Sequence, residues 1–173
     1  AEQDLSKFTS EKEFKPHKIN TRARTAVLLV NGFGGLGLHT VFGAIRLFGK
    51  ELKNFVFVQI GVIDAGVFKG TEEIKRLQQQ VDNELAKYVK YMQHHGYYAE
   101  GVSSIGIDII EEVTKVAPQI LTRFPQPVFF GGQLVFPKEP MFSRWLHNYT
   151  VFAIQRKFYY MGIPVILLPI KIV

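Results

Sequence analysis

Residues 25–37 read T-A-V-L-L-V-N-G-F-G-G-L-G, and this stretch decides the fold. Its first six residues form a continuous apolar run, which is typical of a strand in a parallel sheet covered by helices on both faces. The glycines that follow match G-x-G-x-x-G, a turn that joins such a strand to a helix. The stretch therefore predicts a βα unit at the start of an α/β domain.

Four more apolar segments continue this pattern, at residues 54–64, 97–104, 127–136 and 163–173. Helical periodicity fills the gaps between them, at residues 38–53 and 71–95, from 108 onward, and at 143–161. Because strands alternate with helices, right-handed crossovers are expected to place the strands in parallel. We expect a Rossmann-like, three-layer, doubly wound α/β fold with five parallel strands in the order 3-2-1-4-5.

Single residues indicate where these elements begin and end. Thr71 and Asp108 carry side chains that can cap the helices that follow them. Pro118 lies inside a helical segment and is expected to kink or divide it. Pro169 cannot donate a hydrogen bond to a sheet ladder, so the last strand is expected at a sheet edge.

Length and composition favour one soluble domain. Residues 1–23 have no sustained period and suggest a linker or loosely docked arm, whereas residues 24–173 suffice for a single α/β domain. No apolar run reaches the roughly 18 residues of a membrane span. The absence of cysteine excludes disulfides, thiolate metal ligands and cysteine nucleophiles.

The net charge of +6 allows more than one kind of partner. Nucleic acid is one, but the basic residues are scattered and the sequence holds no DNA- or RNA-binding motif. A solvated basic surface, or one that faces anionic lipid, is the interpretation we favour. We therefore expect no nucleic-acid partner.

The glycine loop is the main candidate site, and we consider two interpretations of it. As a nucleotide or anion site, it would hold a pyrophosphate at the helix N-terminus, with an acid near the end of the second strand on the ribose. As a structural feature, it is a compact turn that binds nothing, and the glycine pair in the fourth strand is a bulge or a close helix contact. The candidate ligand-binding residues are Asn31, Gly32, Gly34, Gly35, Gly37, Asp64, Gly131 and Gly132.

The sequence contains no convincing catalytic constellation. It has no H-x-x-x-H or H-E-x-x-H metal pair and no G-x-S-x-G nucleophile elbow. The paired acids Glu111 and Glu112 stand at a helix start, where the helix dipole explains them. We expect no enzyme activity, no metal site and no required cofactor, with a nucleotide as the one alternative.

Four segments together resemble a known family. They are T-A-V-L-L-V-N-G-F-G-G-L-G-L-H-T at 25–40, N-F-V-F-V-Q-I-G-V-I-D-A-G-V-F-K-G at 54–70, V-F-F-G-G-Q-L-V-F at 128–136 and R-W-L-H-N-Y-T-V-F-A-I-Q-R at 144–156. Over residues 25–173 the chain is similar to the cytosolic C-terminal domain of bacterial permeases of the amino acid–polyamine–organocation superfamily.

This resemblance implies a fold and a setting. Such domains follow the last transmembrane helix and have a fold similar to universal stress proteins. The resemblance therefore implies a regulatory or assembly domain on the cytoplasmic side of an inner or plasma membrane, with the membrane domain of the same polypeptide as a partner. ATP-binding universal stress proteins carry Asp where this chain has Asn31, and their later glycine motif is missing here, so ATP binding is not implied.

The last strand also predicts self-association. Residues 163–173 begin at Ile163, end at Val173 and are strongly apolar, and a bare edge strand is a surface for pairing. We expect a homodimer through this strand and the neighbouring aromatic helix at residues 145–160. A monomer whose edge is shielded by the N-terminal arm is the alternative.

Overall fold

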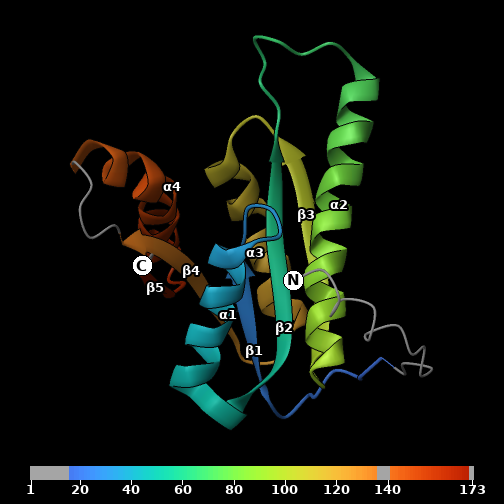
Figure 1. The fold of residues 1–173 in the computed structure, drawn as a ribbon, viewed down its shortest axis with the longest axis vertical. Helices are drawn as coiled ribbons and strands as arrows, with labels where there is room; N and C mark the ends of the chain where they lie inside the picture. Colours follow the sequence, from blue (N-terminus) through green and yellow to red (C-terminus); the bar gives the residue numbers. More distant parts are fainter. Residues whose placement is uncertain (1–15, 136–140, 172–173) are drawn as a thin grey trace, which may run out of the picture.

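The computed structural model describes the backbone of residues 16–135 and 141–171, and the side chains of residues 16–132 and 150–170. Strands and helices alternate along the chain (Figure 1). The elements are β1 (Arg24–Leu29), α1 (Gly35–Phe48), a short 3₁₀ helix (Gly49–Glu51), β2 (Leu52–Val62), α2 (Thr71–His94), β3 (Tyr98–Gly106), α3 (Ile109–Arg123), β4 (Pro127–Val135), α4 (Met141–Tyr160) and β5 (Val165–Lys171).

The five strands form one parallel sheet in the order β3-β2-β1-β4-β5, which confirms the predicted topology. β1 lies at the centre, where Leu29 pairs with Val58 of β2 on one side and Gly131 of β4 on the other. Among the described strands β5 pairs with β4 alone and so lies at an edge, as Pro169 predicts. The carboxyl end of β1, from which the glycine loop leaves, is therefore central in the sheet.

Each face of the sheet is covered by two helices, because successive strand residues point to opposite faces. Phe55 and Phe57 of β2 pack with the buried residues of α1 and α2. Val56 and Val58 pack with those of α3 and α4 on the other face. Figure 1 shows the two helix layers with the sheet between them. This is the three-layer, doubly wound architecture expected from the sequence.

The helix boundaries correct the expected cap at Thr71 and exclude the expected division of a helix at Pro118. Thr71 is the first helical residue of α2 and not its cap; Gly70 occupies the cap position and provides no side chain. Pro118 does not divide α3, which is continuous across it. Ala117 and Ile120 are buried on either side of Pro118, so packing against the sheet holds the helix together despite the missing amide donor. Asp108 caps α3 as predicted, since its carboxylate accepts from the Glu111 amide over 3.0 Å.

The segment before β1 contacts the sheet at its amino end. The Asn20 amide donates to Asn54 Oδ1 over 2.8 Å, and Asn54 Nδ2 donates to the Asn20 carbonyl over 2.8 Å. Asn54 is fully buried, so this exchange satisfies a polar side chain in the core. The remainder of the predicted arm, residues 1–15, lies outside the described residues.

None of the helices in the described part of the chain combines the length and the hydropathy needed to cross a membrane.

Candidate functional site at the glycine loop

The glycine loop connects β1 to α1 at the carboxyl end of the sheet. Gly32 has φ +75°, a left-handed conformation that glycine adopts without a steric penalty. Gly34 occupies the cap position of α1, which begins at Gly35, three residues earlier than the sequence suggested. The amide groups of the first turn of α1 therefore point toward this loop, the arrangement that favours an anion.

Two side chains of α2 contact the loop directly. The carboxylate of Glu84 accepts a hydrogen bond from the Phe33 amide over 3.2 Å. The Tyr88 hydroxyl donates to the Gly32 carbonyl over 2.7 Å and accepts from the Gly34 amide over 3.4 Å. The chain thus supplies its own anionic oxygen to an amide of the loop.

The same two side chains explain two of the glycines. A Cβ at Gly37 would collide with the Tyr88 hydroxyl, and a Cβ at Gly32 would lie 2.6 Å from Glu84 Oε2. Apart from the adjoining residues of the chain, no heavy atom of the described residues lies within 4 Å of the position that a Cβ would take at Gly34 or Gly35. Gly37 is therefore needed for packing against Tyr88 and Gly32 for its left-handed backbone conformation, whereas Gly34 and Gly35 leave open space.

A buried glutamine extends this network into the sheet. Gln59 of β2 is 4% exposed, and its Nε2 donates to Glu84 Oε2 over 3.4 Å. Its Oε1 is buried and has no hydrogen-bond partner among the described residues. Burial also raises the pKa of the neighbouring Tyr88, with the Glu84 charge as a smaller cause in the same direction. Tyr88 therefore stays a neutral donor under ordinary conditions.

An open depression of about 500 Å³ lies beside the loop. Glu84 lines it together with two cationic side chains of α2, Arg76 and Lys87. Phe33, Gln79, Gln80 and Asn83 complete the lining. The depression is polar and shallow, so it could receive a small polar group but could not enclose a ligand on several sides.

The glycine pair of β4 is used for helix packing. A Cβ at Gly132 would collide with Thr40 Oγ1 of α1, and a Cβ at Gly131 would lie 3.1 Å from Val151 of α4. The two positions point to opposite faces of the sheet, each toward a helix. The structure therefore brings Gly132 close to the first turns of α1 but gives neither glycine an open surface.

Asp64 and Asn31 stand apart from this network. The last residue of β1, Leu29, pairs with Val58 of β2. β2 continues for four residues beyond Val58, a length of about 13 Å. Asp64 lies past that end, and its carboxylate accepts from the Gly66 amide over 2.9 Å within its own turn. Figure 1 shows this β2–α2 connection projecting beyond the rest of the sheet. Asn31 is exposed at the start of the loop.

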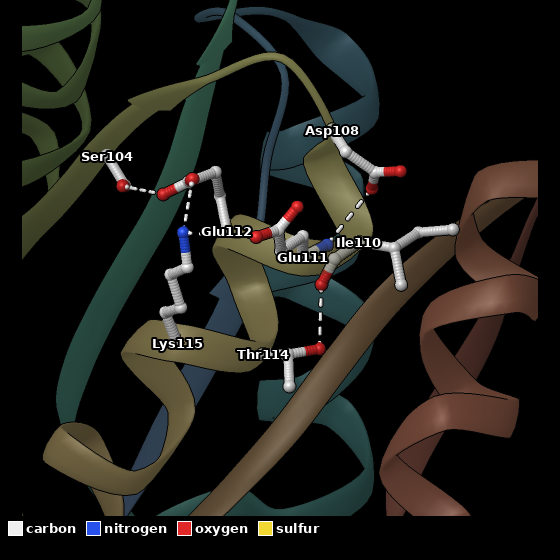
Figure 2. Close-up of polar contacts among 7 residues, drawn as sticks. All are labelled: Ser104, Asp108, Ile110, Glu111, Glu112, Thr114 and Lys115. Atoms are coloured by element: carbon white, nitrogen blue, oxygen red, sulfur yellow. Dashed lines mark hydrogen bonds and ion pairs between the residues drawn. The ribbon is translucent and has the colours of Figure 1, made fainter.

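A second polar cluster, which the sequence did not indicate, joins β3 to α3. Ser104 donates to Glu112 Oε2, and Lys115 lies 3.2 Å from Glu112 Oε1 and 3.3 Å from Glu111 (Figure 2). The hydrogen bond from Ser104, followed by that from Lys115, lowers the pKa of Glu112. The sequence pattern showed two acids at a helix start but could not show that β3 brings a serine to one of them.

This cluster does not have the properties of a nucleophilic site. Glu112 accepts from Ser104 and pairs with Lys115, and its lowered pKa makes it a weaker base, which disfavours activation of the Ser104 hydroxyl. The described residues also contain no group of three or more metal-ligating side chains. The arrangement links a strand to the helix that follows it.

Comparison with known proteins adds evidence on the fold. No protein-family model matches the chain, and no curated protein matches it. Among solved structures, a protein from the universal stress protein family of Burkholderia pseudomallei is similar, with a TM-score of 0.53 and 13% sequence identity. The match covers 87% of this chain and 99% of that protein. At this identity the likeness is one of architecture, and the chain therefore has a universal-stress-protein-like α/β fold.

Proposed function

We propose that the chain is a non-catalytic regulatory or assembly domain of an amino acid permease, on the cytoplasmic side of the membrane. The proposal rests on the four permease-like segments, two of which form β1, the glycine loop and β2 at the centre of the sheet. A fold shared with the universal stress protein family agrees with what this resemblance implies. The membrane domain of the same polypeptide would be the partner.

The observation that carries the non-catalytic part is the filling of the glycine loop by α2. Glu84 and Tyr88 use the Phe33 amide and the Gly32 carbonyl, which are groups that an external ligand would otherwise meet. A loop whose polar groups are bound internally supports a structural role. The domain would then act through contacts made by its surface and by the edge strands of its sheet.

The full reading frame tests this proposal most directly. We expect about a dozen apolar segments, each long enough to span a bilayer, before the region that corresponds to residue 24. Deleting residues 24–173 from that polypeptide should change transport rate or assembly while the transported substrate stays the same. A reading frame without such segments would contradict the proposal.

A nucleotide-binding sensor is the second candidate, and one observation favours it. Gly34 and Gly35 leave open space at the N-terminus of α1, and Arg76 and Lys87 line a depression that Phe33 of the same loop borders. A thermal-shift screen separates the two candidates, because a nucleotide at about 100 times its dissociation constant adds about 2.7 kcal/mol to stability. The regulatory proposal expects no such shift.

We also propose that the chain pairs with a second copy through β5. This strand lies at a sheet edge, and Pro169 removes one donor while the carbonyl groups remain. Beside it, a depression of about 540 Å³ is bordered by Tyr159, Pro164 and Val165. The strand edge and the side of α4 that carries Tyr159 would face the partner, with Arg156 at the border of this surface.

A further inference from the structure

We propose that the outer face of α4, on the side of α3, docks on an anionic lipid surface. The docking face is defined by Phe152, Arg156, Lys157 and Tyr160 of α4 together with Ile110 of α3. This inference concerns a surface of the chain itself and does not depend on the permease proposal.

The helix geometry of α4 separates this face from the core. Ile154 and Phe158 are buried against the sheet, four residues apart on one side of the helix. Phe152, Arg156 and Tyr160 recur at the same spacing on the other side and are exposed. Phe152 is 45% exposed and Tyr160 is 73% exposed, so aromatic rings flank a cation on a surface that faces solvent.

A groove gives this face its shape. Its volume is about 370 Å³, and it lies between α4 and the first turn of α3. Figure 2 shows Ile110 pointing away from the Ser104–Glu112–Lys115 cluster. The acids of that helix start have partners within α3 and β3: Asp108 caps the helix, Glu112 bonds to Ser104 and Glu111 pairs with Lys115. The groove is lined by the apolar side chains of Ile110, Phe152 and Ala153, with Tyr160 and the cations Arg156 and Lys157.

The charge of the docking face favours an anionic lipid surface as its partner. The two charged side chains that line the groove, Arg156 and Lys157, are both cationic. Two adjacent cations flanked by aromatic side chains suit the anionic headgroups and interfacial layer of a bilayer. A second copy fits less well, because a two-fold contact through this face would oppose Arg156 and Lys157 to themselves.

Vesicle sedimentation with the full 173-residue chain tests the proposal. We expect binding to phosphatidylcholine vesicles that contain phosphatidylglycerol, and much less binding to phosphatidylcholine alone. Binding should fall steeply as salt rises toward about 1 M, where the Debye length is about 3 Å. No preference for the anionic vesicles, or no effect of salt, would overturn the proposal.

Charge reversal locates the surface. Arg156→Glu with Lys157→Glu should lower the partition coefficient at least about tenfold. The matched control, Lys87→Glu with Lys90→Glu, makes the same change in net charge on α2, which covers the opposite face of the sheet. An equal loss in the control would show a diffuse charge effect and overturn the assignment to α4.

A third variant tests whether the aromatic side chains of the docking face contribute to lipid binding. Phe152→Ser with Tyr160→Ser changes two exposed side chains, so thermal unfolding should be little altered while binding to anionic vesicles falls. Light scattering on each variant separates lipid from self-association. If the charge-reversal or serine variants turn a dimer into a monomer and leave vesicle binding intact, the face belongs to a second copy and the lipid proposal is wrong.

Discussion

The hydroxyl of Tyr88 donates a 2.7 Å hydrogen bond to the carbonyl oxygen of Gly32, and this bond ties α2 to the glycine loop. The ring of Tyr88 also stacks on Phe57 with centroids 4.6 Å apart. The rings of Phe33 and Tyr88 meet in a T-shaped arrangement with centroids 4.8 Å apart. One buried side chain thus holds a loop, a strand and a helix together. We therefore expect changes at this contact to alter the stability of the fold and the amide exchange of the loop.

Gly37→Ala should destabilise the fold, because the new methyl group would overlap the Tyr88 hydroxyl. Overpacking of this kind costs about 1–3 kcal/mol, measurable by urea unfolding. Gly34→Ala is the matched control, since in the described part of the structure only its chain neighbours lie within 4 Å of its Cβ position. Equal stability of the two variants would show that Tyr88 moves aside freely.

Glu84→Ala should cost about 1 kcal/mol of unfolding free energy, because it leaves the Phe33 amide and the Gln59 side chain without their acceptor. Glu84→Gln keeps one acceptor oxygen, so we expect a smaller loss. Amide exchange at Phe33 is the local measurement, and it should speed up in the alanine variant. An unchanged rate would mean that Glu84 does not hold the loop.

Gly34→Ala also tests the nucleotide alternative. If the loop binds a phosphate, this variant should weaken binding far more than it weakens folding, because the methyl group crowds the anion's approach. Titration calorimetry with ATP measures both the starting protein and the variant. If the starting protein binds no nucleotide at millimolar concentration, the sensor hypothesis loses its site.

The alkaline limit of stability should depend on Tyr98. Burial, followed by its hydrogen bond to Glu100, raises the pKa of Tyr98 from 10.0 to about 12. Because the folded pKa lies above the unfolded one, the stabilisation is complete below about pH 10 and disappears as the pH rises through about 12. In an alkaline titration followed by tyrosinate absorbance, the Tyr98→Phe variant should lack the step at the highest pH. The exposed Tyr159→Phe serves as control.

The mass of the protein in solution tests the β5 edge. We expect light scattering to give a dimer, and Pro169→Asp to weaken it, because the exposed proline would become a charge at the paired edge. Position 169 lies outside the core, so the monomer should remain folded. A monomer mass at high concentration, unchanged after deletion of residues 1–23, would rule out this interface.

The sequence predicted the strand order of the sheet better than the contacts of the glycine loop. Strand order follows from alternating elements and crossover handedness, and Pro169 placed β5 at an edge. The glycine pattern marks a close approach at the loop but does not identify what approaches. Glu84 and Tyr88 lie on a helix whose periodicity shows only that one side is apolar. Their contact with the loop exists only once the chain has folded.

Pro118 and Thr71 show the same limit at the level of single residues. Local preference assigns proline to a helix break and threonine to a cap. Burial of Ala117 and Ile120 keeps α3 intact, and Gly70 occupies the cap position of α2. Tertiary packing decided both positions, and a local pattern does not report it.

The distance along the chain between the loop and its partners has a consequence for the order of events during synthesis. The bonds from Gly32 to Tyr88 and from Phe33 to Glu84 span 56 and 51 positions. A nascent chain that has emerged only as far as β2 contains every glycine of the motif but neither side chain that closes it. The loop can therefore take its final form only after α2 has left the ribosome and docked on the sheet.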